Sequence, residues 1–191
     1  MTPFTVLAGP VAILDRANVD TDQILPARFL RKPRSAGYQN YLFHDLRQAD
    51  PAFPVRGDAP ILLAGENFAC GSSREGAVYA LVDAGIRCVI APSFGDIFAS
   101  NAGKNGLLTV VLSAADIATL RARLTGPLTV DLPAQRLVPP DGAVLAFAID
   151  PFRKRCLVEG LDDIGLTLAH AAEIAQFQAK DRAARPWATP A

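Results

Sequence analysis

Apolar and polar positions divide the middle of the chain into a strand, a loop and a helix. The apolar run at 61–64 lies between Pro60 and Gly65, which is typical of a short buried strand. Residues 77–84 are nearly all apolar and contain no helix breaker before Gly85, so they predict a helix that ends at a glycine. The small and polar residues between these two runs are therefore expected to form a loop that leads from a strand into a helix.

The rest of the chain repeats this alternation of short apolar runs and turn residues. An apolar stretch at 87–91 follows the predicted helix after a short turn, which indicates a βαβ unit with parallel strands. The segment 27–46 is rich in loop formers and reads as a loop with short helical turns. Further strands are expected at 5–14, 107–112, 128–132 and 144–149, and further helices at 96–101, 114–124 and 168–179. We find no repeat and no long linker, so we expect one domain over residues 1–191 with a mobile tail from about residue 182.

The residues from Ser72 to Glu75 match the S-x-x-E capping box at the predicted start of the helix. A helix start presents free N–H groups and the positive end of the helix dipole, which favour a carboxylate or a phosphate. Arg74 adds a guanidinium that can hold a carboxylate through two hydrogen bonds. Taken alone, the pattern has a simpler interpretation, because most capping boxes only stabilise a helix by about 1 kcal/mol.

Composition narrows the classes of function. Half of the 191 residues are hydrophobic, which is enough for a packed core. Lys plus Arg and Asp plus Glu number 19 each, so no net field favours nucleic acid or a membrane surface. No apolar run is long enough to span a bilayer, and the first residues lack the pattern of a signal peptide. We therefore expect a cytoplasmic protein without a nucleic-acid or membrane partner.

The cysteine pattern bears on redox state and on metals. Cys70, Cys88 and Cys156 are odd in number and widely spaced, which argues against a disulfide framework and fits a reducing cytosol. The same spacing argues against an iron–sulfur or zinc site formed by this chain alone. His44 and His170 are isolated from each other and from the cysteines. The chain is therefore expected to bind no metal and no cofactor by itself.

Residues 65–75, GENFACGSSRE, closely resemble the active-site signature of the aconitase-family swivelling domain, as found in small subunits of 3-isopropylmalate dehydratases. Stretches at 18–30, 89–108 and 160–168 resemble further motifs of this family, in the family's order. Four matches in order, spread over most of the chain, are far more specific than any one of them. The resemblance implies an α/β fold: a single swivelling β/β/α domain with a mixed central sheet and flanking helices.

The resemblance also implies an activity. Members interconvert 2-isopropylmalate and 3-isopropylmalate by dehydration and rehydration, a hydro-lyase reaction of leucine biosynthesis. It further implies that the chain acts only with a separate large subunit, whose cysteines hold a [4Fe–4S] cluster that serves as Lewis acid. Two alternatives stay open. One is a paralogous hydro-lyase subunit for another hydroxy acid, of the citraconate, methylated malate or homoaconitate type, and the other is a non-catalytic anion-binding domain.

Matched to the family's motifs, Ser72 is the expected catalytic base, acting as an alkoxide that the helix start and Arg74 stabilise. Ser73 and Arg74 are expected to bind a substrate carboxylate. Asp22 matches the family's N-terminal active-site aspartate and is expected to orient a basic group across the subunit interface. The basic segment 28–34 is the candidate for recognising the variable end of the substrate. For any single residue in it, a place in a solvated charged loop is an equally weighted alternative. The substrate-binding candidates in this segment are Arg31, Lys32 and Arg34.

The sequence departs from the family pattern just after the signature. Gly76 stands where the family usually has histidine, and Val78 and Tyr79 stand where it usually has Pro-Trp. A glycine inside a helix costs up to about 1 kcal/mol relative to alanine. One hypothesis is that Gly76 makes room for a different substrate or for a side chain of the partner. The other is that the chain is a divergent paralogue, and both leave the identity of the hydroxy acid open.

Overall fold

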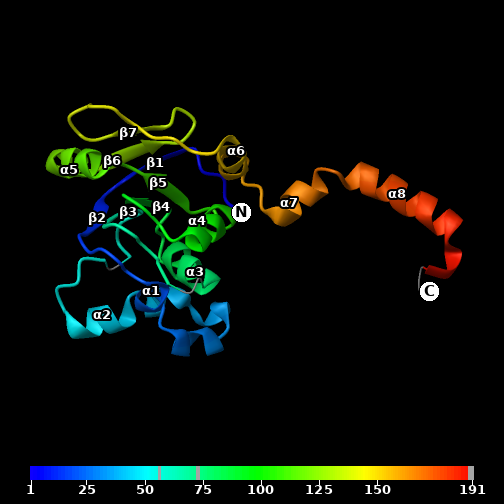
Figure 1. The fold of residues 1–191 in the computed structure, drawn as a ribbon, viewed down its shortest axis with the longest axis horizontal. Coiled ribbons are helices and arrows are strands. Elements are labelled where there is room, and N and C mark those ends of the chain that lie inside the picture. The colour runs from blue at the N-terminus through cyan, green and yellow to red at the C-terminus, as the bar shows by residue number, and fades with distance from the viewer. Residues whose placement is uncertain (56, 72–73, 189–191) are drawn as a thin grey trace.

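The computed structural model describes residues 1–55, 57–71 and 74–188, and within these ranges the chain forms two four-stranded sheets and a layer of helices (Figure 1). One sheet is parallel, in the order β2 (Val11–Leu14), β3 (Ile61–Ala64), β4 (Cys88–Ala91) and β5 (Leu108–Val111). The other is antiparallel, in the order β1 (Val6–Gly9), β6 (Leu128–Asp131), β7 (Arg136–Val138) and β8 (Leu145–Ala146).

Helices α1 to α5 lie between strands in the sequence, and α6 to α8 follow the last strand. The α-helices are α1 (Thr21–Ile24), α2 (His44–Ala49), α3 (Glu75–Asp83), α4 (Asp96–Lys104), α5 (Ala114–Arg123), α6 (Pro151–Glu159), α7 (Asp163–Leu168) and α8 (Ala171–Ala184). The 3₁₀ turns are η1 (Ala27–Arg31), η2 (Arg34–Ala36), η3 (Tyr38–Tyr41) and η4 (Pro186–Ala188). Along the described ranges, no helix combines the length and the apolar character that crossing a membrane requires.

The α/β fold class is confirmed, and the strands divide between two sheets where we expected one mixed sheet. The division occurs inside the segment 5–14, which the pattern predicts as one strand. Pro10 separates β1 from β2, and the two strands join different sheets. Proline lacks the N–H that continuous pairing requires, so a break at this residue has a direct physical cause.

The parallel sheet is covered on both faces, which explains the unbroken apolar run of β3. Leu62 and Ala64 belong to the core cluster that contains the buried face of α3. Ile61 and Leu63 belong to a second cluster, which the parallel sheet shares with the antiparallel sheet. Alternate residues of a strand point to opposite faces, so a strand between two cores must be apolar at every position.

The predicted elements match the observed ones best where the observed elements are most buried. The parallel strands β3 and β4 flank α3, which confirms the βαβ unit, and Ser113 caps α5 through the N–H of Asp116 (3.1 Å). Helix α4 continues to Lys104, beyond its predicted end at residue 101. The pattern did not predict β7 or α6, and β8 is two residues long where a strand at 144–149 was expected.

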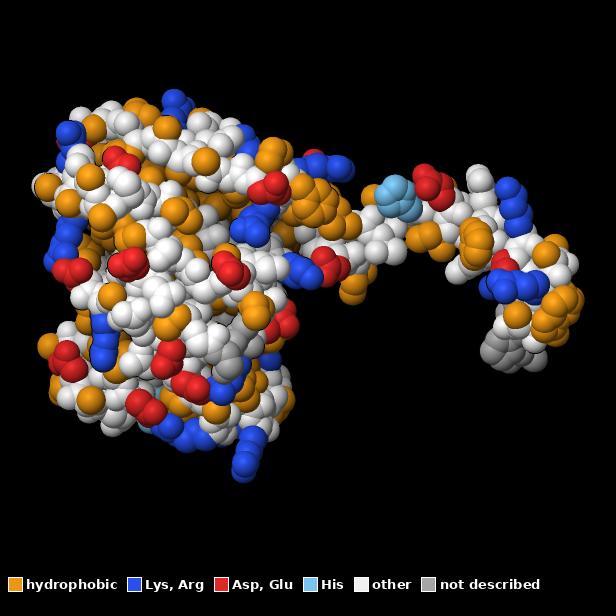
Figure 2. Space-filling model, viewed as in Figure 1, with side chains coloured by type: hydrophobic (Ala, Val, Ile, Leu, Met, Phe, Trp, Pro, Cys, Tyr) orange, Lys and Arg blue, Asp and Glu red, His pale blue; other side chains and the backbone are white. Residues whose placement is uncertain are grey.

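Helices α7 and α8 and the 3₁₀ turn η4 form an arm that projects from the body of the molecule (Figure 1). Helix α8 begins at Ala171 and ends at Ala184, so it extends past the predicted end of the C-terminal helix at residue 179. Within α8 no residue is buried, and hydrophobic side chains lie exposed along the arm (Figure 2). Phe177 is 66% exposed and Trp187 is 80% exposed.

Candidate functional site

Three loops meet at the carboxyl edge of the parallel sheet, the edge at which open α/β sheets commonly bind ligands. The loop after β2 bonds to the loop after β3, because the Cys70 N–H donates to the Val19 carbonyl (3.2 Å) and the Thr21 N–H donates to the Cys70 carbonyl (3.1 Å). The loop after β4 joins them through the Phe68 N–H, which donates to the Ser93 carbonyl (3.0 Å). Backbone hydrogen bonds thus hold the three loops together.

The loop that leads to the signature serines has an uncommon backbone. Asn67, Ala69 and Gly71 all have a positive φ, at 55°, 58° and 86°. Left-handed non-glycine residues are unfavourable and persist only where their surroundings hold them. Here the Asn67 side chain donates to the Asn18 side-chain oxygen (2.8 Å), and the Asn67 N–H donates to Ser93 Oγ (2.9 Å). The neighbouring loops therefore fix the conformation of this one.

Gly95 allows the loop after β4 to approach the signature loop closely. A Cβ at this position would lie 2.5 Å from the carbonyl oxygen of Ala69, closer than real contacts allow. The Gly95 N–H also donates to the Phe68 carbonyl (3.0 Å). No local sequence pattern indicates this role of Gly95, because the contact joins two loops that are distant in sequence.

Helix α3 begins at Glu75, with Arg74 at the N-cap in an extended conformation (φ −123°, ψ 118°). Glu75 therefore occupies the first helical position, and the predicted capping box, which needs it two positions further into the helix, is wrong. The Glu75 carboxylate instead accepts a hydrogen bond from Asn105 Nδ2 (2.9 Å), which links α3 to the end of α4. The predicted site residues Ser72 and Ser73 lie outside the described residues.

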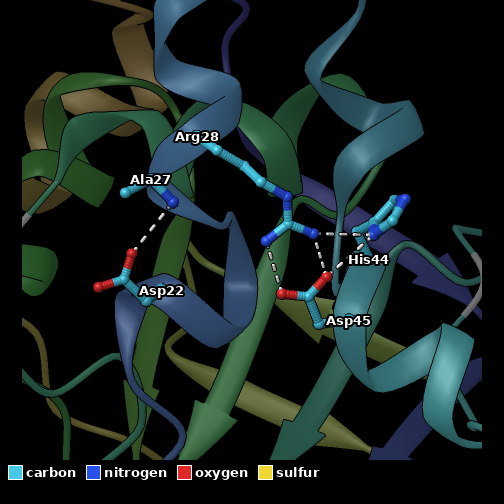
Figure 3. A network of polar contacts seen from close by, with 5 residues as sticks. All are labelled: Asp22, Ala27, Arg28, His44 and Asp45. Carbon is cyan, nitrogen blue, oxygen red and sulfur yellow. Dashed lines mark hydrogen bonds and ion pairs between the residues drawn. The ribbon is translucent and has the colours of Figure 1, made fainter.

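Asp22 and Arg74, which are 52 residues apart in sequence, form an ion pair at this edge. Asp22 lies in α1, whose start is fixed by a capping box in which Asp20 accepts from the Gln23 N–H (2.7 Å). The Asp22 carboxylate also accepts from the Ala27 N–H (3.1 Å; Figure 3). We expected Asp22 to orient a basic group across a subunit interface, and the structure pairs it with the arginine of its own chain.

The first arginine of the basic segment is directed away from this pair. Arg28 donates to both carboxylate oxygens of Asp45, and His44 lies against the same carboxylate at 3.0 Å (Figure 3). These hydrogen bonds, first that of Arg28 and then that of His44, hold the pKa of Asp45 far below its usual value. Arg28 is thus engaged by a neighbouring helix.

The three predicted substrate-binding residues of the segment differ in their contacts. Lys32 donates to the Tyr41 hydroxyl (2.6 Å) and lies over the Tyr41 ring. Arg34 forms a two-point ion pair with Asp83. Arg31 is exposed, and among the described residues it has no hydrogen-bond or ion-pair partner. The structure therefore leaves Arg31, of these three, available to a ligand.

The space beside Gly76 is filled by the chain itself. A Cβ on Gly76 would lie 2.4 Å from Leu30 Cδ2, 3.1 Å from Leu25 Cδ2 and 3.7 Å from Tyr38 Cε2. The hypothesis that this glycine makes room for a substrate or for a side chain of the partner is therefore wrong. It instead lets the basic segment, through Leu30, pack against α3.

The donor set of this chain does not fit an iron–sulfur cluster. Cys70 is in the signature loop, Cys88 is inside β4 and Cys156 is in α6. Burial raises the pKa of the Cys88 thiol well above its ordinary value, which disfavours the thiolate that binds iron. Within the part of the chain that the structure describes, no group of three His, Cys, Asp or Glu side chains could hold a metal ion.

The chain thus stacks a parallel sheet on an antiparallel one, and three βα loops converge at the carboxyl edge of the parallel sheet. The family model described as aconitase C-terminal domain matches residues 1–115. A model described as LeuD_N matches residues 119–151, and a model of the C-terminal domain of the 3-isopropylmalate dehydratase small subunit matches residues 163–191.

Similar proteins match over nearly the whole chain. A 3-isopropylmalate dehydratase small subunit from Xanthobacter autotrophicus is 49% identical, over 98% of this chain and 100% of its own. One from Magnetococcus marinus is 45% identical, over 98% and 99%. The crystal structure of a 3-isopropylmalate dehydratase (leuD) from Methanocaldococcus jannaschii has a TM-score of 0.67 at 26% identity, covering 92% of this chain and 99% of that one. The chain belongs to the 3-isopropylmalate dehydratase small-subunit family, as its motifs predicted.

Proposed function

We propose that this chain is the small subunit of a hydro-lyase that interconverts 2-isopropylmalate and 3-isopropylmalate in leucine biosynthesis. One observation carries the proposal: in a chain whose relatives bear this name over their full length, Arg74 of the signature forms an ion pair with Asp22 at the carboxyl edge. A guanidinium held at that edge suits a substrate that carries carboxylates.

The reaction requires a base and a carboxylate clamp. In the dehydration direction Ser72, as alkoxide, takes the proton from the carbon next to a carboxylate, and the hydroxide leaves from the neighbouring carbon. The reverse direction returns that proton and adds the hydroxide. Arg74 and Ser73 bind the substrate carboxylate, and Asp22 holds the Arg74 guanidinium in place until the substrate arrives. Arg31, which has no partner among the described residues, recognises the variable end of the substrate.

The partner in this proposal is a large subunit, which supplies the [4Fe–4S] cluster as the Lewis acid that helps the hydroxide leave. The donor set described above supports this division, since it does not fit a cluster. The exposed hydrophobic side chains of the arm, including Phe177 and Trp187, offer an apolar surface to that subunit. We place the assembly in the cytoplasm, which the three unpaired cysteines support.

The test is activity after reconstitution with the cognate large subunit, anaerobically and with iron and sulfide. Formation of the unsaturated acid is followed from 3-isopropylmalate and, separately, from citramalate. Ser72→Ala should abolish turnover. Ser113→Ala is the matched control, because it removes the α5 cap at a cost of about 1 kcal/mol but lies outside the proposed site.

Each outcome separates the proposal from its alternatives. Turnover of 3-isopropylmalate that Ser72→Ala abolishes and Ser113→Ala preserves supports both the activity and the role of the serine. Turnover of citramalate alone moves the assignment to a paralogous hydro-lyase. No turnover of either acid with a loaded cluster contradicts the proposed reaction.

A further inference from the structure

We propose that one face of α3, formed by Gly76, Tyr79 and Asp83, is a clamp that positions the basic segment 28–34 and so presents Arg31 to the substrate. These residues are spaced three and then four positions apart, so they line one face of the helix. None of them is expected to touch substrate, and we assign them as positioning residues. The inference rests on the proposed function of the basic segment.

The first contact of the clamp is steric. Leu30 Cδ2 would lie only 2.4 Å from a Cβ on Gly76, so the leucine occupies the volume that any larger residue would need. Gly76 itself is buried. Tyr38, whose ring borders the same space, donates its hydroxyl to the Lys32 carbonyl (2.9 Å). Gly76 therefore allows Leu30, the residue just before Arg31, to pack directly against α3.

The second contact of the clamp is electrostatic. Arg34 Nη2 lies 2.6 Å from Asp83 Oδ1, and Arg34 Nε lies 3.1 Å from Asp83 Oδ2, which is the two-point geometry of a strong arginine–carboxylate pair. The Arg34 guanidinium also lies over the Tyr79 ring, 4.1 Å from its centroid. These bonds fix the segment three residues after Arg31.

Arg31 thus lies between two fixed points, Leu30 and Arg34, and has no partner of its own among the described residues. A loop that must be ordered on binding lowers the affinity for its ligand, and a loop already held in place avoids that cost. The clamp therefore contributes to substrate binding, which KM reports, and leaves the chemical step unchanged.

The main test is Asp83→Asn, which keeps the size of the side chain and removes its charge. Tryptic cleavage after Arg31 and Arg34 in the isolated chain should rise about fivefold, and in the reconstituted enzyme KM should rise about fivefold at unchanged kcat. Asp131→Asn is the control. It breaks the Asp131–Arg136 pair on the antiparallel sheet, whose aspartate is 18% exposed against 20% for Asp83. Both readouts should stay at the wild-type value in this control.

A second test uses the steric contact. Gly76→Ala should displace Leu30 and raise KM, and Leu30→Ala removes the side chain that the new methyl group meets. The double variant should therefore have the KM of Leu30→Ala alone, a non-additive result that direct contact predicts. Additive effects of the two substitutions would contradict the steric part of the clamp.

The clamp and the proposed function fail in different ways. If Asp83→Asn and Asp131→Asn are cleaved at the same rate, or if cleavage rises while KM is unchanged, the clamp is overturned even in an active enzyme. If the wild-type assembly converts no hydroxy acid, the proposed reaction fails. The tryptic cleavage rates of Asp83→Asn and Asp131→Asn can still be compared in the isolated chain, and faster cleavage of Asp83→Asn shows that Asp83 holds the segment.

Discussion

Gly95→Ala tests whether close contact between two loops builds the site. Gly95 has an ordinary backbone conformation (φ −62°, ψ 131°), so alanine is accommodated by the main chain and only its methyl group is in conflict. That methyl group would lie 2.5 Å from Ala69 O and 3.4 Å from Cys70 Cα, both backbone atoms of the signature loop. The loop cannot withdraw freely, because Phe68 is hydrogen-bonded on both sides to the segment that contains Gly95.

The magnitude follows from these contacts. Forcing one extra carbon into a packed site costs about 1–3 kcal/mol, and each weakened backbone hydrogen bond adds about 1 kcal/mol. Replacing glycine by alanine restricts the unfolded chain, which offsets about 0.4–1 kcal/mol. We therefore expect Gly95→Ala to lower the free energy of unfolding by about 2 kcal/mol, a large share of the roughly 5–15 kcal/mol typical of a domain.

Urea unfolding of the isolated chain measures this change, which corresponds to a midpoint lower by about 1 M for an m-value of about 2 kcal/mol per M. Gly126→Ala is the control, because its new methyl group would meet only the Pro140 side chain, at 3.3 Å. A Gly95→Ala variant as stable as Gly126→Ala would refute the argument that the two backbones are in contact.

Three further substitutions test other parts of the account. Asp22→Asn should lower kcat/KM about three- to tenfold by releasing Arg74. Asp141→Asn, which breaks a similarly exposed ion pair between Arg123 and the β7–β8 connection of the antiparallel sheet, should not, and equal activities of the two variants would contradict the role of the Asp22–Arg74 pair. Because its hydrogen-bonded partners lower the pKa of Asp45, the stability from this carboxylate is present above about pH 4 and lost as the pH falls through that lowered pKa. Wild type should thus lose stability more steeply than Asp45→Asn below about pH 4 in urea titrations, and parallel curves would count against the ion pair. Phe177→Ser should weaken binding of the large subunit about tenfold in a titration while leaving the unfolding midpoint unchanged, and an unaltered affinity would exclude this side chain from the interface.

The sequence predicted the buried central elements well and missed two short or largely exposed ones, α6 and β7. Strands β3 and β4 and helix α3 were found because burial on both faces, or along one face, leaves an apolar pattern that is visible in one dimension. Helix α6 was missed because it buries little beyond Cys156 and Leu157 and is otherwise polar. Strand β7 was missed because it is three residues long and only Leu137 in it is fully buried.

The candidate site shows the same division. Its residue types were evident, since the signature stretch, Asp22 and the basic segment all resemble motifs of one family. The ion-pair partners of these residues were not evident from the sequence. Asp22 pairs with Arg74 and Arg34 pairs with Asp83, and each pair is about 50 residues apart. No local pattern records which side chains meet when separate βα loops converge on one sheet edge.

The sequence by itself therefore indicated the family, through the resemblance of its motifs, and the strand–loop–helix unit that carries the signature, through its hydrophobic pattern. Only the tertiary structure decided three features: β1 and β2, on either side of Pro10, join different sheets; Leu30 occupies the space beside Gly76; and Arg31 has no partner among the described residues. The reason is physical: propensity and hydrophobic pattern act between near neighbours, whereas close packing and ion pairing depend on which distant segments the fold brings within a few ångströms.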